Sequence, residues 1–368
     1  MGRVHLEALR RVEWVDVVAI AGRELEPARR LGAGFGVERA EKDYRELLHD
    51  ASIDAVHICT PNVSHYQIAK DALLAGKHVL CEKPLATSVE QAEELVNLAR
   101  ERKLRNCVCH NLRCYPMVQQ MRRMLEGGQL GRVLVVQGTY SQDWLLYPTD
   151  WNWRVDALAG GPSRTMADIG SHWFDTVEHV TGLSVRSLCA DLQTFHRTRK
   201  RPKGRVETFA SQTSVKDVED VPVDTEDFGT VMFRLGEEAR GSMTASQVSA
   251  GRKNGFRLEI YGTESSVVWN QERPDELWIG HRNSPNQIIL KDPALMEESA
   301  RAYADLPGGH SEGYDDTFKQ IFRRFYKSIA EPESALEYPQ MTDGLRQLIL
   351  LRAEFESHRN RRWVEVAD

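Results

Sequence analysis

Glu82 and Lys83 are the first residues whose chemistry and position suggest a function. They follow the apolar run of "VLCEKPLAT" (79–87), which predicts a buried strand ending at Pro84. Open α/β sheets bind ligands at the carboxyl ends of their parallel strands, and an ammonium group there can orient a hydroxyl and stabilise a developing alkoxide. An ordinary lysine at a strand end is an equally good interpretation of Lys83 from position alone.

A second group lies in "DIGSHWFDTVEH" (168–179), which predicts a helix. Its polar residues recur at intervals of 4, 3 and 4 and therefore share one face: Asp168, His172, Asp175 and His179. A separate apolar stripe can dock the helix: Ile169, Trp173, Val177 and Val180. A histidine held by a carboxylate one turn away suits acid–base catalysis. Metal binding and an exposed charged face are the alternatives.

The segment "CTPNVSH" (59–65) places small polar groups at the end of another predicted strand. Thr60, Pro61 and Asn62 come just before a predicted helix. Backbone amides and small polar side chains at such a point can contact a nucleotide.

Three cysteines and a histidine lie together in "CVCHNLRC" (107–114), which raises a metal site as one interpretation. The C-x-C-x4-C spacing lacks the closer pairs typical of metal sites. A buried strand with alternating faces explains the segment better, so we expect no metal.

The elements around these motifs change character near residue 113. From about 15 to 112, apolar strands alternate with helices, which predicts βαβ units and a doubly wound parallel sheet. After 113, a helix, a strand and the helix at 168–182 lead to consecutive strands from about 185 to 290, which predict a mostly antiparallel sheet. The basic run "HRTRKRPKGR" (196–205) is expected to be a solvated loop. Helices around 311–330 and 341–358 close the chain.

Size and composition limit the function classes. The 368 residues are enough for two domains, and 41% hydrophobic with 28% charged residues indicates a folded chain. A net charge of −6 does not favour nucleic acid as a partner. No apolar run approaches the ~20 residues of a membrane span, and the N-terminus lacks the apolar core of a secretory signal. We therefore expect a cytoplasmic protein with no membrane partner.

Taken together, "CTPNVSH", "CEKPLA" and "GGPSRTMADIGSHWFD" resemble the Gfo/Idh/MocA oxidoreductase family over essentially the whole chain. Three further segments resemble its levoglucosan dehydrogenase-like branch: "YSQDWLLYPTDWNWRVD", "TEDFGTVMFR" and "LPGGHSEGY". The resemblance implies a Rossmann-like NAD(P)-binding domain at 1–112. It also implies an α+β domain at 113–368, with a large, mostly antiparallel open sheet for substrate binding and oligomerisation.

The implied activity is hydride transfer between a sugar or polyol hydroxyl carbon and NAD or NADP, in a homodimer or homotetramer. By carry-over, Lys83 is the lysine of the E-K-P motif, and Asp168 and His172 are the D-x-x-x-H pair. His172, alone or with Lys83, takes the hydroxyl proton, and Asp168 orients the pair.

The resemblance also implies the binding residues. Those expected at the cofactor are Gly2, Arg3, Arg23, Thr60, Pro61, Asn62, His65, Glu82 and Lys83. Those expected at the substrate are Tyr115, Gln142, Trp144, Arg154, Asp168, His172 and His310. The tryptophans of "DWNWRVD" either form a platform for a sugar ring or pack their loop against the sheet.

Two positions depart from the family pattern. "GRVH" (2–5) matches the end of a glycine-rich turn whose strand and first two glycines are absent, so we expect a start codon assigned too far downstream. Gly22 and Arg23 stand where an acidic residue often binds the ribose. An arginine there suits the 2′-phosphate of NADP, while Glu24 can still reach a ribose. NAD and NADP both remain candidates.

Two other functions fit the same resemblance. One is a glycosidase that oxidises its substrate transiently with NAD. The other is a cofactor-impaired, non-enzymatic member, which the incomplete glycine turn favours and the intact Lys83, Asp168 and His172 disfavour.

Overall fold

The chain forms two compact units in a computed structural model that describes residues 1–203 and 217–367. The first unit combines Met1–Cys114 with Gly313–Leu345, and the second combines Tyr115–Glu312 with Arg346–Asp368. The chain therefore returns to its first unit before it ends.

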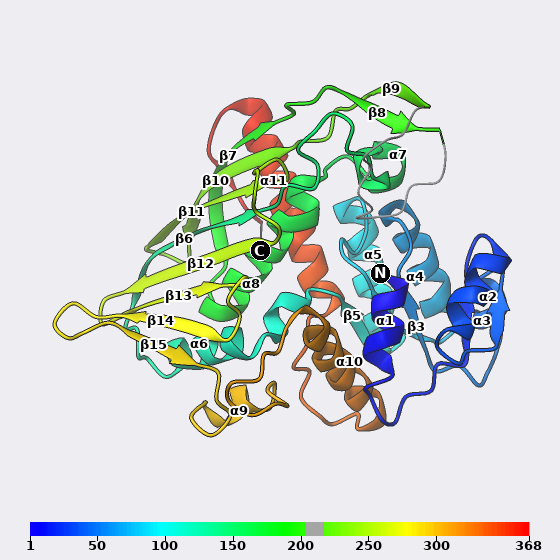
Figure 1. The fold of residues 1–368 in the computed structure, drawn as a ribbon, viewed down its shortest axis with the longest axis horizontal. Helices are drawn as coiled ribbons and strands as arrows, with labels where there is room; N and C mark the ends of the chain where they lie inside the picture. The colour runs from blue at the N-terminus through cyan, green and yellow to red at the C-terminus, as the bar shows by residue number, and fades with distance from the viewer. Residues whose placement is uncertain (204–216, 368) are drawn as a thin grey trace. The chain divides into compact units, whose positions relative to one another are not determined.

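Short parallel strands and helices alternate in the first unit, as the sequence predicts (Figure 1). β1 (Ala19–Ala21) pairs with β2 (Arg39–Glu41), and β4 (His78–Cys81) lies between β3 (Ala55–Ile58) and β5 (Asn106–Val108). Within the described residues these strands form two separate sheets. The helices of this unit are α1 (Gly2–Leu9), α2 (Leu25–Ala33), α3 (Arg45–Leu48), η1 (Asn62–Ser64), α4 (His65–Leu74), α5 (Val89–Glu101), η2 (Asn111–Cys114) and α10 (Tyr314–Ala330).

Local sequence explains where several of these helices begin and end. Gly76 has a φ of 77° just after α4, a conformation that favours glycine. Ser88 accepts a hydrogen bond from the backbone of Gln91 (3.3 Å) and so caps α5. The Gln91 side chain accepts from the backbone N–H of Thr87 (3.3 Å), one residue before the cap.

A nine-stranded sheet dominates the second unit, with the order β15-β14-β13-β12-β6-β11-β10-β7-β16. Only the β6–β11 pair among its described strands is parallel. Its strands are β6 (Val133–Ser141), β7 (Val185–Gln193), β10 (Phe228–Leu235), β11 (Ala239–Ser246), β12 (Gly255–Gly262), β13 (Ser266–Asn270), β14 (Glu276–Gly280), β15 (Gln287–Leu290) and β16 (Val364–Glu365).

Helices cover one face of this sheet (Figure 1). They are α6 (Pro116–Glu126), α8 (Ser171–Thr181) and α11 (Met341–Asn360), and the unit also holds η3 (Trp153–Val155), α7 (Ala157–Gly160), η4 (Met166–Gly170) and α9 (Glu298–Arg301). Trp173 of α8 is fully buried, and its indole N–H donates to the carbonyl of Arg257 on β12 (3.0 Å). A Cβ at Gly138 would lie 2.9 Å from that indole nitrogen, so glycine permits the close approach of α8 to the sheet.

The basic run at 196–205 is not the solvated loop that the sequence suggests. Thr198–Pro202 forms β8, which pairs antiparallel with β9 (Val218–Pro222). Arg199 is fully buried, because it is an inward-facing residue of that strand. Gly204 and Arg205 lie outside the described residues.

None of the helices in the described part of the chain has the length and apolar character needed to cross a bilayer.

Candidate functional site

Asp168 and His172 lie where the helix at 166–181 changes its winding. The sequence predicts one continuous α-helix here, but Met166–Gly170 is a π-helical turn that passes directly into α8. The backbone N–H of Asp168 bonds the carbonyl of Arg164 (2.7 Å) at the start of this turn. Such turns are frequent at functional sites because they re-aim individual side chains.

Two side chains from distant parts of the sequence hold the Asp168 carboxylate. Gln247 donates from Nε2 to Oδ2 (3.0 Å), and Arg154 places Nε 3.4 Å from Oδ1. The guanidinium of Arg154 also stacks over the ring of Trp153, 4.4 Å from its centroid. The structure therefore brings together Arg154 and Asp168, two residues that the sequence assigns to the site.

Residues 142–156, here named the tryptophan loop, have a small core of their own. Leu145, Trp151 and Val155 are buried in one cluster with Val223, and Trp144 packs against it. The Trp144 indole donates to the Oε1 of Gln142 (2.7 Å). Packing thus accounts for Trp144 and Trp151, while Trp153 supports the guanidinium of Arg154.

The other end of the predicted polar face is part of the protein interior. Asp175 is buried, and the Nε2 atoms of His179 and Gln119 of α6 lie 3.0 Å apart. His179 therefore packs α8 against α6, about two helix turns from His172.

Tyr115 and His310 have different surroundings from those expected of substrate contacts. Tyr115 is buried with its ring 5.0 Å from that of Trp269. His310 is exposed, and its carbonyl accepts a hydrogen bond from Lys291 (2.7 Å). Gln247, which sequence reasoning missed, contacts Asp168 directly. It lies just beyond the end of a strand, and no local pattern marks it.

Six of the nine expected cofactor residues follow the carboxyl ends of β3 and β4, whereas Gly2 and Arg3 lie on α1 and Arg23 follows β1. Thr60 is exposed, and Lys83 is half-buried after β4. His65 is fully buried, with Nδ1 2.7 Å from the Pro84 carbonyl oxygen and Nε2 2.9 Å from that of Thr60. His65 therefore connects the two strand ends instead of presenting its ring to a ligand.

Glu82 is buried beside Lys83 and faces His5 of α1. The distance from His5 Nε2 to Glu82 Oε1 is 2.9 Å, and Nδ1 of His5 lies 2.9 Å from Nδ1 of His57. The other ring nitrogen of His57 lies 3.1 Å from the hydroxyl of Tyr326. A hydrogen-bonded chain thus runs from Glu82 through two imidazoles to a tyrosine.

The pKa values of these groups identify where the charge resides. Burial opposes a charge on His5, but Cys59 and Glu82 beside the ring outweigh it and raise the pKa of His5 to about 9. Burial, together with the positive His5, lowers the pKa of His57 well below its usual value. His5 is therefore an imidazolium that donates to Glu82 and to a neutral His57.

His5, Glu82 and Cys109 offer ligand atoms within 4.8 Å of one another, a set that could hold a metal ion. Both ring nitrogens of His5 already take part in hydrogen bonds, and its raised pKa favours a proton over a metal. We therefore interpret this cluster as a charged hydrogen-bonded pair.

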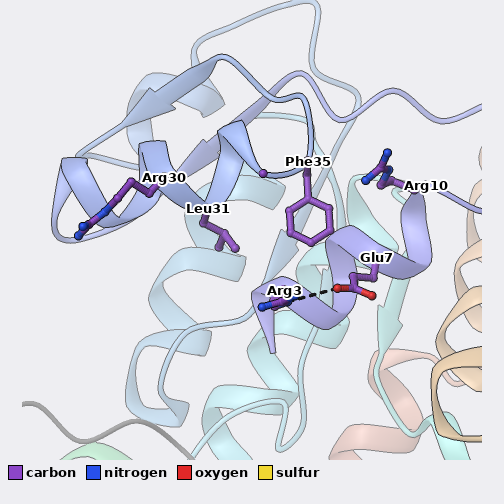
Figure 2. Close-up of a pocket in the computed structure, with 7 residues that line it drawn as sticks. Arg3, Glu7, Arg10, Arg30, Leu31 and Phe35 are labelled. Atoms are coloured by element: carbon purple, nitrogen blue, oxygen red, sulfur yellow. Dashed lines mark hydrogen bonds and ion pairs between the residues drawn. The ribbon is translucent and has the colours of Figure 1, made fainter.

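A pocket between α1 and the α2 region is lined by cationic and apolar side chains (Figure 2). Arg3 pairs with Glu7 (3.2 Å), and Arg10 lies over the ring of Phe35 (5.9 Å). Arg30 points away from that ring in Figure 2. Because Arg3 is paired with Glu7 and Arg30 points away, the pocket by itself identifies no ligand. Arg23, the candidate for a 2′-phosphate, is exposed elsewhere on the unit.

Parallel strands followed by Thr60 and Lys83 in one unit, and an Asp168–His172 pair on a sheet-covering helix in the other, are typical of a nicotinamide-dependent oxidoreductase. The model of the "Oxidoreductase family, NAD-binding Rossmann fold" matches residues 1–110, and that of the "GFO/IDH/MocA C-terminal domain" matches 118–268. The chain belongs to the Gfo/Idh/MocA family. This confirms the predicted family, fold class and nicotinamide cofactor.

Named relatives span nearly the whole chain. It is 32% identical over 363 residues to levoglucosan dehydrogenase from Pseudarthrobacter phenanthrenivorans, and the aligned region covers 95% of this chain and 89% of that protein. A solved levoglucosan dehydrogenase in complex with NADH and levoglucosan has a TM-score of 0.89 at 30% identity, covering 100% and 97% of the two chains. An inositol dehydrogenase homologue complexed with NAD+ from Azotobacter vinelandii has a TM-score of 0.86 at 25% identity, covering 99% and 93%.

The charged state of His5 predicts a pH-dependent stability. Above pH 6.5 the unfolded chain releases the His5 proton, while the folded chain keeps it until about pH 9. The charged His5 therefore contributes its full stabilisation to the folded state below pH 6.5, and this stabilisation is lost as the pH rises to 9. The variant His5→Gln should be less stable than the unmodified chain at pH 6.5. We expect this difference in the free energy of unfolding to shrink by on the order of 3 kcal/mol as the pH rises to 9. Urea unfolding at several pH values measures it.

The exposed His49 provides the control for this experiment. His49→Gln should leave the pH profile of unfolding as it is in the unmodified chain. If His5→Gln also leaves it unchanged, His5 does not carry a charge in the folded protein.

Proposed function

We propose that this protein oxidises a ring hydroxyl of a sugar or polyol, with NAD+ or NADP+ as the oxidant, or catalyses the reverse reduction. The observation that carries the proposal is the Asp168 carboxylate, held by Arg154 and Gln247 one turn before His172. Among the relatives, levoglucosan dehydrogenase is named for an anhydrosugar substrate, and another is described as an inositol dehydrogenase homologue; both names point to this class of compound.

The residues at the carboxyl ends of β3 and β4 fit a nicotinamide dinucleotide. Thr60 and Asn62 offer polar groups above an apolar sheet, and Lys83 adds a cation beside them. We assign these three residues to cofactor contact, together with Gly2, Arg3, Arg23 and Pro61. We assign His65 and Glu82 a supporting role, because their hydrogen bonds hold the strand ends that carry these residues. The bound dinucleotide supplies a hydride acceptor at its nicotinamide ring.

The chain's own residues handle the proton. As the carbinol C–H bond gives up its electron pair as hydride, the hydroxyl proton passes to the imidazole of His172, alone or with Lys83, and a carbonyl forms. Asp168 fixes the orientation of His172 and is itself held in place by Gln247. The expectation that Lys83 joins Asp168 and His172 around one substrate belongs to this proposal.

Arg154 is the best-supported substrate residue of the tryptophan loop. Its guanidinium lies between the face of Trp153 and the Asp168 carboxylate, where its remaining N–H groups can donate to sugar hydroxyls. Gln142 and Trp144 support the loop through their mutual hydrogen bond.

We also propose a homo-oligomer. The sheet face opposite the helices exposes Val135 and Met232, at 40% and 51% of their surface. A second copy can cover these apolar side chains.

Incubation with a panel of compounds tests the substrate class. Levoglucosan, glucose and myo-inositol are each supplied with NAD+ and with NADP+, and absorbance of the reduced nicotinamide is followed. We expect sustained accumulation with at least one sugar or cyclitol. Hydrolysis of a glycoside without net cofactor reduction would instead support an NAD-dependent glycosidase. If the protein neither reduces the cofactor nor hydrolyses a glycoside, the result would support a non-enzymatic member.

The catalytic assignment predicts a large loss of turnover. His172→Ala, Asp168→Asn and Lys83→Met should each lower kcat by about a hundredfold or more, because proton transfer and its orientation are lost. His179→Ala, on the same helix, serves as the matched control and should keep kcat within about threefold. A His172→Ala enzyme with normal kcat and an unchanged pH profile would show that another group is the base.

Arg154→Ala should act mainly on substrate binding. We expect the KM for the sugar to rise by about tenfold or more, since a charge-assisted hydrogen bond is lost, while the KM for the cofactor stays constant. Steady-state kinetics with both substrates varied separates the two. An unchanged sugar KM would remove Arg154 from the substrate site.

A further inference from the structure

The buried guanidinium of Arg199 binds the backbone of the tryptophan loop. Its Nη1 donates to the carbonyl oxygens of Tyr147 (2.9 Å) and Asp150 (3.1 Å), and its Nη2 donates to that of Leu145 (2.8 Å). One side chain of β8 thus satisfies three carbonyls of a loop some fifty residues earlier in the chain. The contact involves no residue of the candidate metal motif at 107–114 or of the candidate nucleotide motif at 59–65.

A buried carboxylate completes the arrangement. The Oδ1 of Asp227 accepts from Arg199 (Nη2, 2.8 Å) and from the guanidinium of Arg164, and all three side chains are fully buried. The Oδ2 of Asp227 accepts the backbone N–H groups of Phe195 (2.7 Å) and His196 (3.0 Å). We name Arg164, Arg199 and Asp227 the arginine–aspartate cluster.

The cluster extends to the turn that carries Asp168. Arg164 is the residue whose carbonyl accepts the Asp168 N–H (2.7 Å). The neighbouring Glu226 carboxylate accepts the backbone N–H groups of Arg164 (3.0 Å) and Met166 (2.9 Å). Residues 226–227 therefore hold the start of the π-helical turn from two sides.

Gln247 links the same parts by a second route. Its backbone N–H donates to the carbonyl of Asp227 (3.0 Å), and its carbonyl accepts the N–H of Leu145 in the tryptophan loop (3.2 Å). Its side chain is the one that donates to Asp168. Buried and partly buried hydrogen bonds thus join the tryptophan loop, the arginine–aspartate cluster and the π-helical turn that carries Asp168.

We propose that the arginine–aspartate cluster sets the position of the tryptophan loop relative to the Asp168 turn, with Arg199 as the positioning residue for substrate recognition. The inference rests on the proposed function, in which Arg154 of this loop contacts the sugar. Arg199 itself contacts no substrate. It acts by holding the backbone on either side of Pro148 while Asp227 holds Arg199.

The chemistry of the cluster requires arginine at this position. A guanidinium presents donors in a planar fork, which lets one group reach three carbonyls and a carboxylate at once. A lysine ammonium can pair with Asp227 but has three donors on a single atom. Arg164 remains beside Asp227 when Arg199 is replaced, so Arg199→Met leaves no unpaired buried carboxylate.

Hydrogen exchange of the intact protein, followed by mass spectrometry, tests the positioning role without a substrate. In Arg199→Met we expect exchange in peptides covering 145–151 to accelerate by about tenfold or more, while β7 and β10 keep their protection. Arg199→Lys should show a smaller acceleration in the same peptides. If Arg199→Met does not fold, Arg199→Lys provides the test in its place.

Lys200→Met is the matched control, because Lys200 is exposed on the same strand and pairs with Asp220 (3.0 Å). Its exchange in 145–151 should equal that of the unmodified protein. If Arg199→Met or Arg199→Lys leaves the exchange of these peptides unchanged, the cluster does not position the loop and the proposal is overturned.

Kinetics with the best substrate of the panel supply the functional readout. Arg199→Met should raise the sugar KM by about tenfold with a smaller change in kcat and none in the cofactor KM, as expected for a misplaced binding loop. Faster exchange with an unchanged sugar KM would overturn the role in recognition. Faster exchange in a protein that oxidises no compound of the panel would leave the positioning of the loop intact and would refute the proposed function instead.

Discussion

A buried carboxylate needs hydrogen-bond or ion-pair partners within the protein, and the partners of Asp227 come from several segments of the second unit. Two guanidinium groups and two backbone N–H groups surround Asp227. Breaking a buried ion pair of this kind by removing one partner typically costs about 3–5 kcal/mol, so the elements that supply the partners are held together. Those elements are β8, the segment at 195–196 just before it, and Arg164 at the start of the π-helical turn that carries Asp168. The tryptophan loop is then fixed through Arg199.

The first unit uses the same principle on a smaller scale. Glu82 is buried directly before Lys83, and the imidazolium of His5 compensates its charge. Although burial raises the pKa of a carboxyl, the His5 hydrogen bond and charge outweigh it and lower the pKa of Glu82. Lys83, to which the proposed function assigns a part in proton transfer, therefore follows a residue whose side chain is fixed by charge and packing.

The sequence allowed much of this protein to be predicted. Alternating apolar runs and helical segments predict the parallel strands of the first unit, and consecutive strands predict the sheet of the second. Asp168 and His172 could be named as a pair because they lie one helix turn apart, and Lys83 because it directly follows a strand; their catalytic roles remain part of the proposed function. The π-helical turn at Met166–Gly170 could not, since an α-helical period fits the same residues equally well.

By itself, the sequence determined the family, the classes of the two sheets and the residues with chemistry suited to hydride and proton transfer, because these depend on short-range pattern. Only the tertiary structure decided which polar residues are buried and what they bind. Arg199 looks like one more cation of a basic run, and Gln247 like an ordinary residue after a strand. They become a loop anchor and a partner of Asp168 because sheet pairing brings them to carbonyls and carboxylates far away in the chain. In that dry interior, each such group requires a partner that local sequence cannot reveal.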